Sequence, residues 1–298
     1  MNFSEKRSAD FGKHFDAMTI KRCRLILSYA TLLASFISAD FVSCKFPVSP
    51  PPIAEQPSGQ VLGYVTECMT KCGYDFQNID EIADDDQSLA TAQLAWIDGR
   101  NQYEQARFAV EEFDPPGHYF VAAWFSDHPQ SGFHYIEPLL WSSTPPWGII
   151  HNMVYTLWNG YVPSIPNVCQ GDGFSDGGIF RGMLYTLADI DSLKFSGLDS
   201  SYSRNSVNDV YSNFTGIKTV YEFYRDTVLK YSSGTDSLFN TRMDAAWNNM
   251  ATTPSDFYTL AAYRKAWYGT TYLYPLDSAV VQVARVIAHA DSLNRMPY

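Results

Sequence analysis

A serine between glycines is the first group in this 298-residue chain whose type and setting suggest covalent chemistry. The segment Gly173-Phe174-Ser175-Asp176-Gly177 matches G-x-S-x-G, a pattern in which a sharp strand-to-helix turn exposes the serine hydroxyl. Asp277 and His289 follow in the serine, acid, histidine order of that hydrolase class. Because 163–173 lacks the pattern of a central strand, we favour a glycine-rich loop that leads into a helix. We therefore assign no catalytic residue and keep a serine hydrolase using Ser175 as an alternative.

Histidines and acidic residues form a second group of interest, because they are metal ligands in many proteins. Four histidines lie within 34 residues, with two acidic neighbours: His118, Asp127, His128, His134, Glu137 and His151. They include no H-E-x-x-H and no other closely spaced pair. A separate acidic run offers oxygen ligands but lacks the spacing and the glycine of a calcium loop: Asp80, Glu81, Asp84, Asp85 and Asp86. The sequence therefore predicts polar loops here, with no metal and no cofactor.

The cysteines are too few for a dense disulfide framework, since the chain has five. Cys68 and Cys72 are four residues apart and form neither a haem-attachment motif nor a thioredoxin motif. An oxidising compartment favours one disulfide among these two and Cys169, and Cys68–Cys72 is the local candidate. Cys23 is removed if the N-terminal region is a signal.

The N-terminal region has the order of a secretory signal. Lys21, Arg22 and Arg24 precede the apolar run 25–39, and Met18 is a second possible start. A basic segment before 7–15 apolar residues is typical of a signal peptide, because the apolar part enters the bilayer while the cations stay behind. No run of 18 apolar residues occurs, so the sequence predicts no ordinary membrane-spanning helix.

The residues after the apolar run indicate how the signal is processed. Phe41-Val42-Ser43-Cys44 resembles a bacterial lipoprotein box, in which the cysteine is lipidated and becomes the new N-terminus. Residues 45–60 contain five prolines, a composition typical of an extended tether. We expect a removed signal region over 1–43, lipidation at Cys44 and a proline-rich tether over 44–57. Plain secretion is the alternative.

The stretch 58–140 has the pattern of strands and turns. Residues 103–113 alternate, Asp98-Gly99 is a hairpin signal, and Asp114-Pro115-Pro116-Gly117 is a turn. Residues 118–125 are β-branched and aromatic. The segments 58–63 and 107–123, with the Pro-Pro-Gly-x-Tyr turn, resemble the carboxypeptidase-regulatory-like (transthyretin-like, Ig-like) β-sandwich family. The resemblance implies an accessory β-sandwich domain of an exported protein, without catalytic residues.

From residue 141 the pattern becomes helical. Apolar side chains recur at helical spacing over 207–228, which predicts a helix with one aromatic-rich face turned inward. Thr253-Pro254-Ser255-Asp256 predicts the start of a helix that ends at Gly269, and 275–296 predicts another. We therefore expect an α+β chain, in which an N-terminal antiparallel β-sandwich (58–140) precedes a mostly α-helical domain of about five helices (141–298).

Charge and composition limit the classes of partner. The net charge is −11, and it becomes −13 without residues 1–43, which argues against nucleic acid. We expect an exported, lipid-anchored, non-enzymatic protein with a β-sandwich stalk and a helical interaction domain. Its place would be the bacterial outer membrane, the periplasm or the cell surface, and its partners the membrane and an unidentified protein or glycan. Aromatic residues make up 15% of the chain, which leaves carbohydrate binding as a further alternative.

Overall fold

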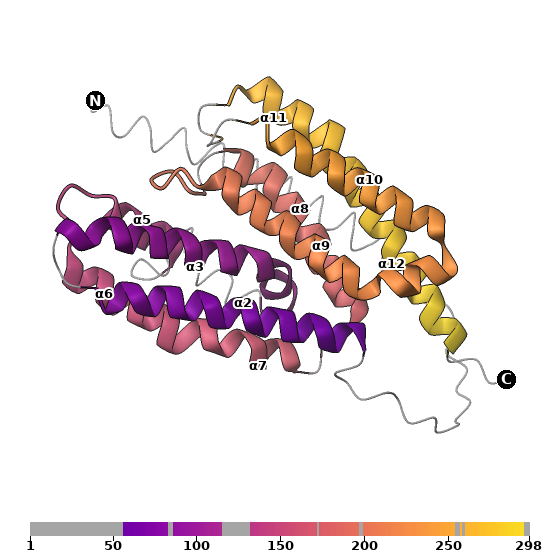
Figure 1. Ribbon diagram of the computed structural model, residues 1–298, viewed down its shortest axis with the longest axis horizontal. Helices are drawn as coiled ribbons and strands as arrows, with labels where there is room; N and C mark the ends of the chain where they lie inside the picture. The colour runs from indigo at the N-terminus through magenta and orange to yellow at the C-terminus, as the bar shows by residue number, and fades with distance from the viewer. Residues whose placement is uncertain are drawn as a thin grey trace, which may run out of the picture. The chain divides into compact units, whose positions relative to one another are not determined.

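The described part of the chain is a set of packed helices. The computed structural model describes residues 56–82, 86–114, 132–171, 173–196, 199–253, 257 and 260–294, and no strand occurs among them (Figure 1). All of these residues belong to one compact unit. The α-helices are α2 (Pro57–Asp80), α3 (Asp86–Phe113), α5 (Phe133–Leu140), α6 (Trp147–Tyr155), α7 (Ile165–Gln170), α8 (Asp176–Ser192), α9 (Ser206–Tyr231), α10 (Ser233–Met250), α11 (Ala262–Tyr268) and α12 (Tyr274–Asn294). The π-helices η2 (Thr156–Tyr161) and η5 (Gly269–Leu273) and the 3₁₀ helices η3 (Val162–Ser164) and η4 (Lys194–Ser196) join some of them.

The predicted β-sandwich over 58–140 is wrong for the residues that the structure describes. Residues 58–63 lie in α2, and 103–113 form the end of α3. The Pro115-Pro116-Gly117 turn and the segment 118–125 lie outside the described residues. The resemblance to the transthyretin-like family is therefore not supported, and for the described residues an all-helical class replaces the α+β class.

The alternation in 103–113 gave a wrong prediction of a strand because α3 is packed by other helices on several sides. This helix packs against α2, α8 and α9, and Figure 1 shows α2 and α3 running side by side. Ala106, Phe108 and Val110, at alternate positions of this segment, are all buried, and so is Ala109 between them. A helix buried on several sides has no broad polar face, so the period of 3.6 residues is hard to see in its sequence.

The predicted hairpin turn at Asp98-Gly99 is also wrong, because both residues lie inside α3. A Cβ atom at Gly99 would lie 2.6 Å from the ring of Phe76 on α2. Glycine at this position thus lets α2 and α3 pack closely, and it marks a helix contact rather than a turn.

Two further glycines let α8 and α9 approach the backbone of α3. A Cβ atom at Gly182 on α8 would lie 2.0 Å from the carbonyl oxygen of Phe108. A Cβ atom at Gly216 on α9 would lie 2.0 Å from the carbonyl oxygen of Gln105. No side-chain movement can relieve a contact with a backbone atom, so these glycines fix α3 close to both neighbours.

Two of the three helices predicted in the second half of the chain are present with similar bounds. The stripe over 207–228 lies on α9, and Val210, Phe214, Ile217 and Tyr221 are among its fully buried members. The helix predicted over 275–296 is α12. The helix predicted from 253 to Gly269 is found only at its end. α11 begins at Ala262, and the described residues 253, 257, 260 and 261 are not helical, so the predicted start is wrong. Residues 254–256 lie outside the described residues.

One hydrophobic core includes residues from both sides of residue 141, from Val61 on α2 to Ile287 on α12. Among the described helices, none combines the length and the apolar character that crossing a bilayer requires. The signal region, Cys44 and most of the proline-rich tether lie outside the described residues.

Candidate functional site

Three charged residues on α3 point into the protein and begin the first candidate site. Arg100, Glu104 and Arg107 are spaced by four and three residues, so they share one face of the helix. Each is at most 2% exposed. Charges buried to this degree need partners, because leaving water costs several kcal/mol per ion.

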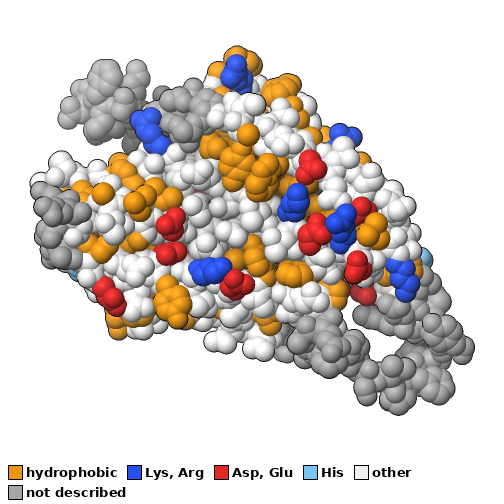
Figure 2. Space-filling model, viewed as in Figure 1, with side chains coloured by type: hydrophobic (Ala, Val, Ile, Leu, Met, Phe, Trp, Pro, Cys, Tyr) orange, Lys and Arg blue, Asp and Glu red, His pale blue; other side chains and the backbone are white. Residues whose placement is uncertain are grey.

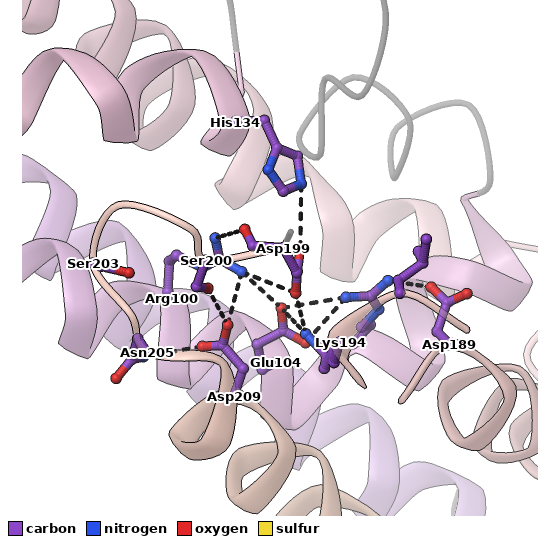
Figure 3. A network of polar contacts seen from close by, with 12 residues as sticks. Arg100, Glu104, His134, Asp189, Lys194, Asp199, Ser200, Ser203, Asn205 and Asp209 are labelled. Carbon is purple, nitrogen blue, oxygen red and sulfur yellow. Dashed lines mark hydrogen bonds and ion pairs between the residues drawn. The ribbon is translucent and has the colours of Figure 1, made fainter. Parts of the chain in front are cut away.

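The guanidinium of Arg100 lies at the centre of this network (Figure 3). Its Nη2 donates to Oδ2 of Asp209 on α9 at 3.0 Å and to Oδ2 of Asp199 at 3.3 Å. Its Nη1 donates to Oε2 of Glu137 on α5 at 3.3 Å. Arg100 thus joins three segments that are far apart in the sequence.

Glu104 occupies the next turn of α3, where Nη2 of Arg100 donates to its Oε1 at 3.4 Å and three further donors hold it. The Nζ of Lys194, in η4, lies 2.9 Å from Oε1 of Glu104 and 2.6 Å from Oδ2 of Asp199. The Nη1 of Arg107 lies 3.3 Å from Oε2, and Nδ2 of Asn213 donates to the same oxygen at 2.9 Å. Lys194 is fully buried, so its position depends on these two carboxylates.

The far end of the network is a pair of carboxyl groups bound to Arg107. Its Nε pairs with Glu111 on α3, and its Nη2 pairs with Asp189 on α8. Burial and the charge of Asp189 hold the pKa of Glu111 well above its usual range, although Arg107 opposes the shift. A proton on Glu111 reduces the repulsion between the two acids.

A turn before α9 encloses the other end. Residues 199–205 connect η4 to α9, and Arg204 has a φ of 58°, in the left-handed region. The backbone amides of Tyr202 and Ser203 donate to Oε1 of Glu137 at 3.1 and 2.6 Å. The Oγ of Ser200 donates to Oδ2 of Asp209 at 2.5 Å. The turn therefore supplies donors that the cations do not.

Burial and neighbouring charges shift the pKa values of the acids in the network in different directions. Burial opposes the ionisation of Glu104, but Lys194 and Arg107 outweigh it and lower its pKa to about 2. Lys194 and Arg100 likewise hold the pKa of Asp199 well below its usual range, against the effect of burial. At Asp209 burial prevails over Arg100 and raises the pKa to about 6.

The carboxylates around Arg100 are already paired with cations, so the chemistry of the network is structural. Glu104, Asp199 and Asp209 have oxygens within 4.8 Å of one another, a spacing that suits a metal ion. The ammonium of Lys194 and the guanidinium of Arg100 contact these carboxylates instead. Buried ion pairs of this kind add little net stability but penalise any arrangement that leaves one member unpaired.

Ser175 has a helix-capping role. It precedes α8 with extended backbone, and its Oγ accepts a hydrogen bond from the amide of Gly178 at 3.3 Å. No strand precedes it among the described residues. Asp277 lies in the first turn of α12, and the exposed ring of His289 faces Tyr231, with 6.4 Å between ring centroids.

The candidate zinc ligands that the structure describes have separate environments. The Nε2 of His134 lies 3.2 Å from Oδ1 of Asp199, and Glu137 accepts hydrogen bonds in the same network. His151 packs against Trp147, with 5.7 Å between ring centroids. His118, Asp127 and His128 lie outside the described residues, as do Asp84 and Asp85 of the acidic run.

The cysteines are buried thiols in this structure. Cys68 and Cys72 lie one turn apart on α2, and Cys169 lies in the last turn of α7. Burial raises the pKa of Cys68 to about 11, which disfavours the thiolate. All three are free here, and the pairing of Cys68 with Cys72 stays a prediction.

A second candidate site is an open polar groove where α2, α3 and α9 meet. Its volume is about 550 Å³. On the face drawn in Figure 2, scattered acidic and basic side chains lie over the part of the molecule where Figure 1 shows α2 and α3. The lining residues are Lys71, Tyr74, Asp75, Asp98, Asn101, Gln102, Gln105 and Ser212.

Several groove residues have no partner within the described part of the chain. The side chains of Asp75, Asp98 and Gln102 form no hydrogen bond and no ion pair with another described residue. Burial and the charge of Asp98 raise the pKa of Asp75 to about 6. Tyr74 is 62% exposed at the same site.

Sequence reasoning missed both sites for one reason. The pattern of 58–140 predicts strands and turns, in which residues three or four apart do not share a face, so residues one helical turn apart are not considered together. The spacing of Arg100, Glu104 and Arg107 was the available signal, since opposite charges at i, i+4 and i+7 share a helix face. The same spacing relates Asp98, Asn101, Gln102 and Gln105 in the groove.

Comparison with known proteins assigns no family. No protein-family model matches this chain, and no curated protein resembles it significantly.

Proposed function

We propose that this chain is an exported, lipid-anchored binding protein of helical fold that acts without catalysing a reaction. The groove lined by α2, α3 and α9 carries this proposal. It is open and of a size that suits a small ligand, and its two carboxylates are not committed to holding the fold together. The buried network, in contrast, uses each of its charges within the protein.

The placement outside the cytoplasm is supported by the N-terminal sequence. The basic residues, the apolar run 25–39, Cys44 and the proline-rich tether follow one another in the order that a lipoprotein requires. A long extended tether leaves the helical unit free to meet a ligand at a distance from the membrane.

Anchoring is tested by labelling with an alkyne analogue of a fatty acid in a bacterial host. We expect the wild-type chain to be labelled and to sediment with membranes. Cys44→Ala should lose both properties, because no other thiol can take the lipid at the mature N-terminus. Cys23→Ala is the matched control and should keep them. A wild-type chain without label would leave plain secretion in place of the anchor.

The rival function, serine hydrolysis at Ser175, predicts a reactive hydroxyl. The capping bond to Gly178 predicts otherwise: Ser175→Ala should lower the free energy of unfolding by about 1 kcal/mol, as loss of an N-cap does. We expect no labelling of the wild type by a fluorophosphonate probe. Stoichiometric labelling that disappears in Ser175→Ala would establish the hydrolase instead.

The aromatic content, which suggested carbohydrate binding, is largely accounted for by the core. Phe76, Trp96, Tyr103 and Phe133 are at most 2% exposed, and their contacts have centroid distances of 5.0–5.8 Å. Rings in such contacts stabilise the fold and cannot stack on a sugar.

A further inference from the structure

The groove has a charge that selects among ligands. Asp75 and Asp98 face the same space, and Lys71 is the cationic residue of the lining. The ammonium of Lys71, however, pairs with Glu67 at 2.6 Å on the exposed side of α2. The groove therefore presents two carboxylates that no cation of the described chain neutralises, and an anionic ligand is excluded.

A metal ion does not fit these donors well. Calcium takes six to eight oxygen ligands, usually with several carboxylates. The groove has two carboxylates. Two of its amide oxygens are already in use, because Asn101 accepts from Asn205 at 3.2 Å and Gln105 accepts from Tyr64 at 3.0 Å.

A neutral polyol leaves the charges of the groove uncompensated. It can hydrogen-bond to Asp75 and Asp98, but it covers them without supplying a positive charge, and burying an uncompensated carboxylate is costly. An ammonium group supplies both the charge and the donors. Tyr74 adds an exposed ring, whose face attracts cations.

We propose that the groove binds a small organic cation, of the polyamine class, through Asp75 and Asp98, with Tyr74 and Gln102 completing the site. This inference rests on the proposed function as a binding protein and names the ligand class. The two carboxylates each accept from an ammonium group, the side-chain oxygen of Gln102 accepts from the ligand, and the Tyr74 ring covers one face.

The test is isothermal titration of the full chain with spermidine at about 0.15 M salt, where attraction to distant surface charges is largely screened. We expect saturable binding by the wild type. Asp75→Asn/Asp98→Asn should weaken it at least tenfold. Tyr74→Ala should weaken it about two- to fivefold, which corresponds to an exposed cation–π contact.

A charge-matched control separates a site from general attraction to an acidic protein. Asp226→Asn/Asp244→Asn removes the same net charge from exposed positions on α9 and α10. We expect its affinity for spermidine to equal that of the wild type. An equal loss of affinity in both double variants would overturn the proposal, because binding would then follow net charge alone.

Two further titrations complete the test. Maltotriose and CaCl₂ should give no saturable binding at the groove. Binding of either that is lost in Asp75→Asn/Asp98→Asn, without spermidine binding, would overturn the amine class in favour of a neutral sugar or a metal. The outcome is independent of anchoring: a chain that binds spermidine but takes no lipid contradicts the lipoprotein and leaves the groove assignment in place.

Discussion

The buried network and the surface groove both contain carboxylates from α3, yet they treat charge in opposite ways. Around Arg100, each acid is paired with a cation, a backbone amide or a hydroxyl. In the groove, Asp75 and Asp98 have no such partners among the described residues. The same helix thus directs one face into a compensated interior and another face toward solvent.

The difference indicates where each set of charges is used. Removing one member of the network leaves buried partners without compensation, which costs free energy. Removing a groove carboxylate relieves repulsion and leaves nothing unpaired. Stability therefore depends on the first set, and ligand binding is available to the second.

The largest expected effect comes from breaking the network at Arg100. Arg100→Met should lower the free energy of unfolding by about 3–5 kcal/mol, since it leaves several carboxylates buried without their cation. Arg100→Lys, which keeps the charge but loses the planar fork, should lose less. Urea denaturation measures both. A loss below about 1 kcal/mol for Arg100→Met would remove the distinction between the two regions.

The pH dependence of stability should show an intermediate effect. Burial raises the pKa of Asp209 from 3.8 to about 6, so the folded protein binds a proton here more tightly than the unfolded chain. The free energy of unfolding should therefore fall as the pH rises from about 4 to 6, by about 1–3 kcal/mol from this residue.

At lower pH the sign reverses. The pKa of Glu104 is lowered to about 2 and that of Asp199 also lies below its usual range, so their contribution is present above pH 4.5 and is lost as the pH falls toward 2. Urea denaturation from pH 3 to 8 should show a maximum near pH 4–5. A maximum at pH 7–8 would contradict the assignment of a raised pKa to Asp209.

The smallest effect is expected in the groove. Asp75→Asn removes a carboxylate whose pKa is raised to about 6, so the charge is unfavourable at neutral pH. The residue is half-buried and solvent screens most of this cost. We expect a gain in the free energy of unfolding of at most about 0.5 kcal/mol at pH 7.5, and none at about pH 3, below the ordinary pKa of the carboxyl. A clear loss at pH 7.5 would show that Asp75 has a structural partner.

Helices of the second half of the fold could be predicted from the sequence, whereas those of the first half could not. The stripe on α9 is visible because this helix has apolar residues on one side and polar residues on the other. On α3 the inward positions include Arg100, Glu104 and Arg107, so polar residues occupy the core and the helical period is interrupted. Pattern reasoning equates polar with exposed, and a buried ionic network breaks that rule.

Prediction of the candidate sites also depended on whether local patterns contain the tertiary contacts. The sequence predicts a turn at Gly99, because glycine after aspartate is a strong hairpin signal. Its contact with the Phe76 ring is a tertiary fact that no local pattern contains. Ser175 was correctly favoured as part of a loop before a helix, since its surroundings lacked the strand that a nucleophile requires.

The close approach of α3 to its neighbours limits which residues can change during evolution. Gly182 and Gly216 face backbone carbonyl oxygens, so no compensating substitution on α3 can make room for a methyl group at either position. A descendant of the same ancestor that retains this helix arrangement must retain both glycines, and the buried charges of Arg100, Glu104 and Arg107 resist change one at a time. These five positions form a short sequence signature by which distant homologues can be recognised after the remaining sequence has diverged.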